Sequence, residues 1–272
     1  MFSHSRDLQF EARPDAPDAA FARRLQELLG GKWGALTVAH QYLFQGWSCR
    51  LPGKYQDLLL DVGTEEMAHV EMLCTMISRL LHDAPLSARE AAEEDVLAAA
   101  VVGGLNPAHL ISAGAGPLPM DSNGVPWTGS YVTTSGNLLA DFYLNVTAEA
   151  QGRLQAARLF QMTDDPGIKQ MLRFLLARNT KHQQIWLAAI EELRQDGLEE
   201  MPVPEAFPDD LRDRAAGAAY LSFSAGSQAG RGSWATAAAA EVDAPAPAPG
   251  EPPTLPAGDP RLYGTTPLPA ID

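Results

Sequence analysis

The sequence predicts an all-α fold built from four long helices. In four segments, at about 19–46, 54–82, 136–162 and 166–196, apolar residues recur at steps of three and four, which places them on one helix face. A stretch rich in Gly, Pro, Asn and Ser at 103–135 indicates a long crossover loop between the second and third helices. Two helical hairpins joined by one long connection form a ferritin-like four-helix bundle, which is the predicted fold.

Local signals indicate where the helices begin and end. We expect the first helix to run without a break through 19–46, with its glycines allowing a neighbouring helix to come close. A shorter helix is expected at 88–102, before the crossover loop. Asp165 can cap the last helix, Pro166 suits its first turn, and Gly197 is placed to end it.

A carboxylate and an imidazole interrupt the apolar face of the second helix. Glu66 and His69 lie three residues apart at the middle of this face. The rest of the face is apolar: Leu59, Val62, Leu73, Met76 and Leu80. Burying both polar groups is costly unless something binds them. A metal ion would bind both, and an inward-facing Glu-x-x-His motif is how helical bundles build dinuclear carboxylate sites.

The other long helices provide candidate partners for this pair. Glu149 lies at the centre of the apolar face of the third helix, and His182 at the centre of that of the fourth. By analogy, the central position of the first helix should carry a glutamate, but it carries Ala35. We therefore predict a metal site formed by Glu66, His69, Glu149 and His182, with one expected carboxylate missing.

The bulk composition narrows the class of protein. The formal net charge of −14 argues against nucleic-acid binding, which depends on basic patches, but does not bear on a small neutral substrate. No apolar run approaches the ~18 residues of a transmembrane helix, and the N-terminal residues lack the features of a signal peptide. We expect a cytoplasmic protein without membrane contact. Cys49 and Cys74 provide no disulfide framework.

The composition changes after Met201. Residues 201–272 are dense in Pro, Ala and Gly, and they offer too little apolar surface to fold alone. We divide the chain into a metal-binding bundle, 1–200, and an extended C-terminal arm, 201–272, that packs on neighbouring subunits. A disordered tail is the alternative. Several aromatic residues are poorly explained by a solvated tail and favour the arm: Tyr220, Phe223, Trp234 and Tyr263.

Several motifs of the chain resemble those of the manganese catalases. They include Leu-Leu-Gly-Gly-Lys-Trp-Gly at 28–34, Gly-Thr-Glu-Glu-Met-Ala-His-Val-Glu-Met at 63–72 and Met-Thr-Asp-Asp-Pro-Gly at 162–167. The resemblance implies a site with two manganese ions per subunit that disproportionates hydrogen peroxide into water and oxygen. It also implies a ligand set of three glutamates and two histidines. Four of these positions are Glu66, His69, Glu149 and His182, and the third glutamate falls at Ala35.

The resemblance implies further roles and an assembly. Glu66 and Glu149 would belong to the catalytic set, together with Tyr42, which would orient a ligand by a hydrogen bond. An ordinary core tyrosine is the alternative for Tyr42. A calcium ion between subunits would use Asp57 and Asp61, which otherwise are two solvated aspartates. Its other ligands would come from a loop of the arm: Ser222, Ser224 and Gly226. The resemblance also implies a homo-oligomer, expected to be a hexamer.

The absent carboxylate at Ala35 leaves three functional readings open. The first is a manganese catalase with an altered ligand set. The second is a structural or catalytically weakened member of the family that binds little metal or one ion. The third is a di-iron oxidase or iron-handling protein, because histidine and carboxylate ligands suit iron as well as manganese. We expect Glu65 to point away from the site toward solvent, about 100° around the helix, so that water or an anion would complete the ligand set.

Overall fold

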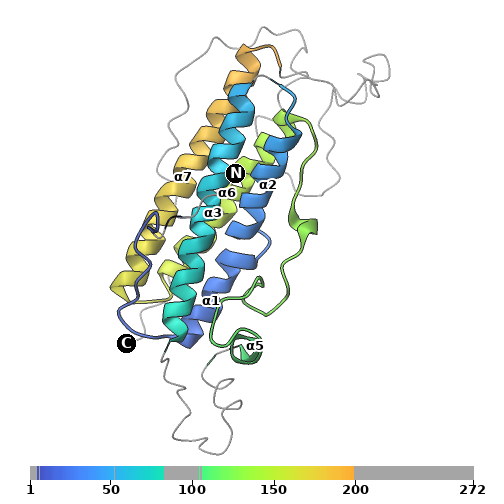
Figure 1. The fold of residues 1–272 in the computed structure, drawn as a ribbon. Coiled ribbons are helices and arrows are strands. Elements are labelled where there is room, and N and C mark those ends of the chain that lie inside the picture. The colour runs from blue at the N-terminus through green and yellow to red at the C-terminus, as the bar shows by residue number, and fades with distance from the viewer. Residues whose placement is uncertain (1–4, 6, 52, 83–103, 105, 199–272) are drawn as a thin grey trace, which may run out of the picture. The chain divides into compact units, whose positions relative to one another are not determined.

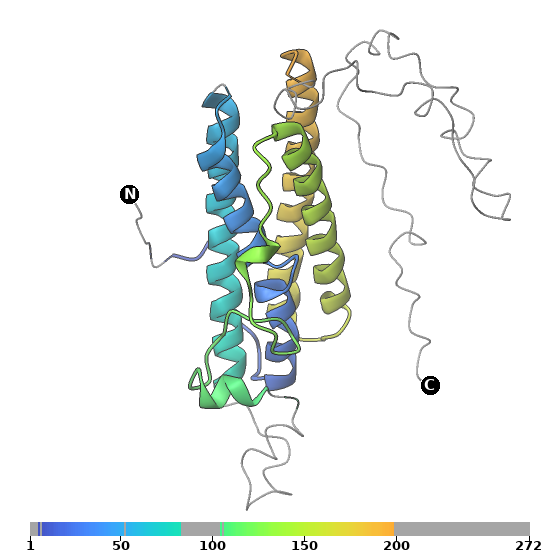
Figure 2. The same ribbon diagram turned by 90° about the vertical axis from the view of Figure 1, so that its right-hand side faces the viewer.

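The computed structural model describes residues 5, 7–51, 53–82, 104 and 106–198. Its long helices form a bundle in which α2 packs along α3 and α6 packs along α7 (Figure 1 and Figure 2). The elements are α1 (Ala19–Gly30), α2 (Ala35–Ser48), α3 (Gly53–Leu81), α5 (Pro107–Ile111), a 3-10 turn η1 (Gly129–Tyr131), α6 (Leu138–Phe160) and α7 (Pro166–Gln195). The described residues contain no strand, only an isolated bridge between Met120 and Pro126. The all-α bundle predicted from the sequence is confirmed.

The first long helix is broken in two, which corrects the expectation of one continuous helix. α1 ends at Gly30 and α2 begins at Ala35, after an extended Gly31. A Cβ atom at Gly30 would lie 2.4 Å from the backbone oxygen of Met120, and one at Gly31 would lie 2.5 Å from that of Glu27. These glycines therefore let the crossover loop and the chain's own backbone come close at the break, rather than a neighbouring helix.

The other predicted helix ends agree with the structure to within two residues. Asp165 caps α7 by accepting a hydrogen bond from the backbone N–H of Ile168 at 2.9 Å. Pro166 occupies the first turn, and Gly197 follows the helix with a φ of +67°, which glycine adopts readily. The predicted helix at 88–102 lies outside the described residues.

The crossover loop runs along α1 and α2. The side chain of Gln26 donates to the backbone oxygens of Leu118 and Met120, at 2.6 and 2.8 Å. Further along, the indole of Trp127 donates to the hydroxyl of Thr37 at 3.0 Å. These bonds fix the loop against both parts of the broken helix. None of the described helices is long and apolar enough to cross a membrane.

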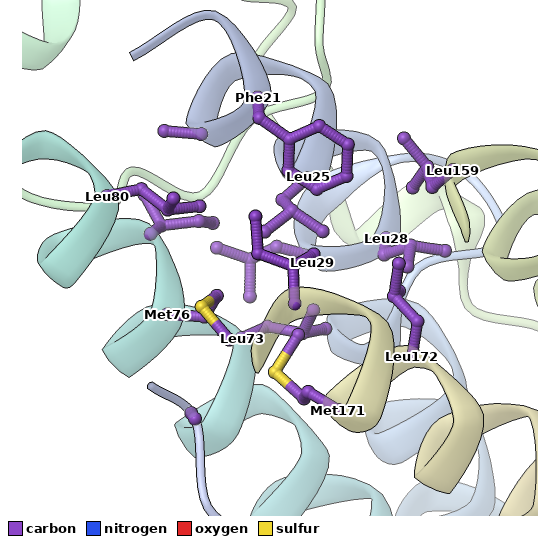
Figure 3. Packing of buried hydrophobic residues seen from close by; sticks show 14 of the residues in the cluster. Phe21, Leu25, Leu28, Leu29, Leu73, Met76, Leu80, Leu159, Met171 and Leu172 are labelled. Atoms are coloured by element: carbon purple, nitrogen blue, oxygen red, sulfur yellow. The ribbon is translucent and has the colours of Figure 1, made fainter. Parts of the chain in front are cut away.

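Two apolar clusters fill the bundle on either side of a polar layer. One contains Phe21, Leu25, Leu29, Met76 and Leu172, among others (Figure 3). The second is formed around several aromatic side chains, which include Tyr55, Phe142 and Trp186. Full burial of each large apolar side chain contributes about 1.5–3 kcal/mol, so both clusters can hold a costly polar layer between them.

Candidate metal centre

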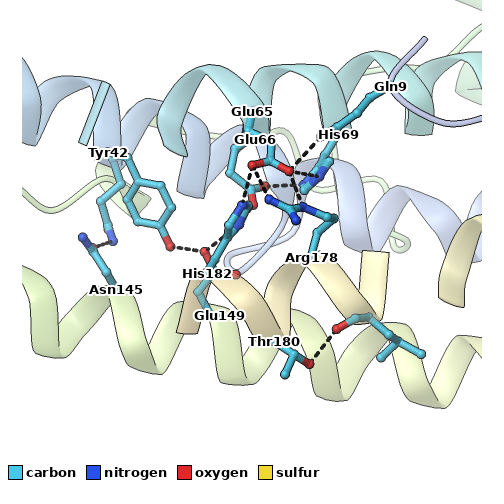
Figure 4. A network of polar contacts seen from close by, with 12 residues as sticks. Gln9, Tyr42, Glu65, Glu66, His69, Asn145, Glu149, Arg178, Thr180 and His182 are labelled. Carbon is cyan, nitrogen blue, oxygen red and sulfur yellow. Dashed lines mark hydrogen bonds and ion pairs between the residues drawn. The ribbon is translucent and has the colours of Figure 1, made fainter. Parts of the chain in front are cut away.

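Three helices bring the predicted metal-binding side chains together in that layer. Glu66 and His69 come from α3, Glu149 from α6 and His182 from α7 (Figure 4). On α3 the pair lies between the residues of one apolar cluster, which end at Val62, and those of the other, which begin at Met72. All four side chains are buried, with at most 3% of their surface exposed.

The Glu66 carboxylate lies between the two histidines. Its Oε1 is 2.9 Å from Nδ1 of His182, and its Oε2 is 3.1 Å from Nδ1 of His69. Oε1 of Glu149 is 3.5 Å from the same His182 nitrogen. Among the described residues, one ligand atom each from Glu66, Glu149 and His182 lie within 4.8 Å of one another. Both Nδ1 atoms thus face the same cluster of carboxylate oxygens.

The burial of this cluster changes its protonation. Burial alone would lower the pKa of His182, but its contacts with Glu149, Glu65 and Glu66 raise that pKa to about 11. Burial and the charge of Glu66 raise the pKa of Glu149. The pKa of Glu66 is lowered because His69 and His182 outweigh its burial. Without a metal, protons therefore balance the buried carboxylates, and metal binding would release them.

Glu65 lies directly behind His182, and the expectation that it points into solvent is wrong. Its Oε2 accepts a hydrogen bond from Nε2 of His182 at 2.9 Å, and Arg178 binds the same carboxylate through two nitrogens. Gln9 donates to Oε1 at 2.8 Å. The side chain is only 20% exposed. Glu65 does lie about 100° around α3 from Glu66, but α7 covers that side of α3. The imidazole of His182 therefore contacts Glu65 through Nε2 and Glu66 through Nδ1.

A sequence signal for this arrangement exists in α7. Arg178 and His182 are four residues apart and share a helix face, so a cation and an imidazole approach α3 together. An acidic partner on the facing helix is expected from that pairing, but the spacing does not say which helix faces it. The bonds from His182, Arg178 and Gln9 together outweigh the partial burial of Glu65 and lower its pKa.

Tyr42 contacts one of the predicted ligands, the carboxylate of Glu149. Its hydroxyl donates to Oε1 of Glu149 at 2.7 Å. The tyrosine is fully buried, and burial together with the charges of Glu149 and Glu66 raises its pKa well above the usual value. The phenol therefore stays protonated and acts as a hydrogen-bond donor to Glu149.

Ala35 faces a small cavity beside the carboxylates. The cavity has a volume of about 30 Å³ and is bounded by Ala35, Glu66, His69, Glu149 and Asn179, with apolar side chains completing its wall. His40 does not reach it, because its Nδ1 is 2.7 Å from the backbone oxygen of Leu36 and its ring packs near Trp127. The short side chain of Ala35 leaves this space open, and no carboxylate of the described residues fills it.

The residues of the expected calcium site are only partly described. Asp57 and Asp61 lie on α3 and are exposed to solvent. Ser222, Ser224 and Gly226 lie outside the described residues, as does the whole arm at 201–272.

The donor set fits a transition metal. Ligand atoms of Glu66, Glu149 and His182 lie close enough to share one ion, and Nδ1 of His69 faces the other oxygen of Glu66. Carboxylate and imidazole ligands of this kind suit manganese and iron. Nε2 of His69 is buried without a hydrogen-bond partner, whereas Nε2 of His182 is held by Glu65. A carboxylate behind a ligand histidine fixes the tautomer that leaves the other nitrogen free for a metal.

A family model and named relatives match this chain. The profile of the family described as manganese containing catalase matches residues 1–266. A manganese catalase of Bacillus subtilis is 53% identical over 234 residues, which cover 86% of this chain and 85% of the relative. One of Lactiplantibacillus plantarum is 49% identical over 195 residues, covering 72% and 73%.

A solved structure agrees with these relatives. The crystal structure of a manganese catalase from Anabaena superposes with a TM-score of 0.68 at 28% identity, and the match covers 88% of this chain and 97% of that one. The match extends over most of the chain in both sequence and fold. The protein is therefore a member of the manganese catalase family.

Proposed function

We propose that the protein disproportionates hydrogen peroxide into water and oxygen at a dinuclear manganese centre held by Glu66, His69, Glu149 and His182. The observation that carries the proposal is the convergence of these four buried groups in a layer between two apolar clusters. The names of the relatives agree with it. Two molecules of peroxide give two of water and one of oxygen, so no outside reductant is needed.

The chain's own residues would bind and orient the centre. Bound manganese would supply two-electron redox chemistry and act as a Lewis acid toward peroxide. Glu66 presents one oxygen to each histidine, which suits a carboxylate shared between two sites. Glu65 holds the Nε2 proton of His182, so that Nδ1 faces inward. Tyr42 fixes the orientation of Glu149 through its hydroxyl.

Metal analysis combined with oxygen release tests this function. The purified protein should bind manganese and release oxygen from peroxide. His69→Ala and His182→Ala should each lower the metal content, because each removes one ligand nitrogen. Glu191→Gln, which changes an exposed carboxylate on α7, is the matched control and should leave both quantities unchanged. Equal metal content in all four proteins would rule out this site.

The Ala35 cavity favours a second reading, a weakened enzyme. With one carboxylate fewer, two divalent ions repel each other more strongly, so the second ion should bind less tightly. Less than two manganese ions per chain with slow oxygen release would support this reading. Two iron ions with ferroxidase activity would instead support a di-iron protein, which the same donor types allow.

We further propose that the arm at 201–272 holds a homohexamer and contributes, with Asp57 and Asp61, to a calcium site between subunits. Both ideas rest on the family resemblance of the arm. Deleting residues 205–272 should reduce the mass of the assembly in light scattering, and calcium should stabilise the intact chain only. An assembly of unchanged mass after truncation would contradict the role of the arm.

A further inference from the structure

We propose that the cavity at Ala35 binds a small carboxylate anion, of the size of formate or bicarbonate, which replaces the side-chain carboxylate that residue 35 lacks. The inference rests on the proposed function, because the anion would be held against the bound manganese ions. In this chain the additional metal ligand would be an anion taken from solution and not a side chain of the protein.

The size of the cavity sets the class of ligand. A water molecule needs roughly 10–15 Å³ of such space, so a volume of about 30 Å³ holds about two water-sized groups. A carboxylate with one carbon atom fits this space far better than a longer acid does. The cavity lies between Ala35 on α2 and the carboxylates of Glu66 and Glu149, which is where an anion would meet the metal ions.

The charge balance of the loaded site favours an anion over water. Two divalent ions carry four positive charges, and Glu66 and Glu149 supply two negative ones. Glu65 adds no net charge, because Arg178 is paired with it. Excess charge in a buried layer is costly unless a counter-ion lies beside it. A bound monoanion removes half of the excess, whereas a water molecule removes none.

The wall of the cavity explains why the anion should be small and should bind only with metal. Leu28, Leu73 and Leu175 contribute apolar surface to the wall, and this part of the wall gives an anion no hydrogen-bond donors. The two carboxylates at the other side repel an anion when no metal is present. Affinity for the carboxylate and affinity for manganese are therefore coupled, and each should raise the other by the same factor.

The test measures this coupling without relying on turnover. Metal-free protein is titrated with manganese in the presence of rising sodium formate, and the dissociation constant is measured by competition with a chelator. Formate should tighten the weaker manganese site about tenfold, within the range typical of coupled ligands. Bicarbonate and acetate, each with one heavy atom more than formate, should act in the same way but less strongly, and chloride least. Faster carbon-13 relaxation of formate that appears only when the protein has manganese bound would locate the anion near the metal.

Two variants at residue 35 separate the possible outcomes. Ala35→Leu fills the cavity without a charge and should abolish the formate effect. Ala35→Glu supplies the carboxylate within the chain, so it should bind manganese tightly without formate and ignore added formate. Manganese binding by the natural protein that does not change with formate would overturn this inference and leave the proposed function intact. No manganese binding under any condition would overturn both.

Discussion

Replacing Glu65 should weaken metal binding, although this residue is not one of the predicted ligands. Its carboxylate accepts the Nε2 hydrogen of His182 at 2.9 Å, and Arg178 and Gln9 hold it in that position. Loss of the carboxylate would leave His182 free to rotate or to change tautomer. Nδ1, which faces Glu66 and Glu149, would then carry the proton in part of the molecules.

The contacts set the size of the effect. Loss of a group that hydrogen-bonds a ligand histidine typically costs 10- to 100-fold in metal affinity, or about 1.4–2.7 kcal/mol. Glu65→Gln keeps an oxygen for His182 but loses the ion pair with Arg178, so its effect should be near tenfold. Glu65→Ala leaves both His182 and Arg178 without this acceptor, so its effect should approach 100-fold.

The assay must distinguish positioning of His182 from ordinary stability. Manganese affinity is measured by chelator competition, and the melting temperature of the metal-free protein is measured in parallel. We expect Glu65→Gln to lower the metal-free melting temperature by a few degrees, because it weakens the contacts with His182 and Arg178. Manganese affinity should still fall about tenfold at a temperature where both proteins stay folded. Glu191→Gln serves as the control for the lost charge. Unchanged affinity in both Glu65 variants would refute the role assigned to this carboxylate.

Two further predictions concern neighbouring contacts. Tyr42→Phe removes the only hydroxyl bond to Glu149 seen among the described residues. It should destabilise the protein by about 1–3 kcal/mol and lower its affinity for manganese. Thermal melting measures the first effect, and a metal titration measures the second. Gly30→Ala places a methyl group 2.4 Å from the backbone of Met120 and should cost about 1–3 kcal/mol, whereas Gly53→Ala, which meets no atom within 4 Å, should leave the melting temperature unchanged.

The helix pattern and the ligand set could be predicted from the sequence because both depend on local periodicity. A carboxylate or imidazole in the middle of an apolar stripe stands out at any position along one helix. Glu149 and His182 were placed in this way on separate helices, and the structure brings both to Glu66. The ends of α7 can be predicted in the same way, because the residues that mark them, Asp165 and Gly197, lie within a few residues of where the helix begins and ends.

The contacts between helices could not be predicted in the same way. The role of Glu65 depends on which helix covers its side of α3, and no local pattern states that. The glycines before Ala35 are compatible with close helix packing or with a break, and only the approach of Met120 decides between them. The cavity depends on how several helices pack around the short side chain of Ala35, so the sequence indicates the small residue but not whether neighbouring side chains fill the space beside it.

A glutamate in place of Ala35 should have opposite effects on the metal-free and the metal-bound protein. In the metal-free layer, Glu66 and Glu149 already compete for the positive charge of His182, and burial raises the pKa of Glu149. A third carboxyl group there would have to remain protonated, at a cost of about 1–3 kcal/mol if its hydrogen bonds are incomplete.

Ala35→Glu should therefore lower the melting temperature of the metal-free protein by several degrees while it raises the affinity for manganese. Calorimetry of both states and a manganese titration measure the two effects in one pair of proteins. A metal-free variant as stable as the natural protein would show that the layer tolerates a third carboxyl group without cost. Ala35 would then give the metal-free protein no stability advantage over glutamate at this position to offset its weaker binding of manganese.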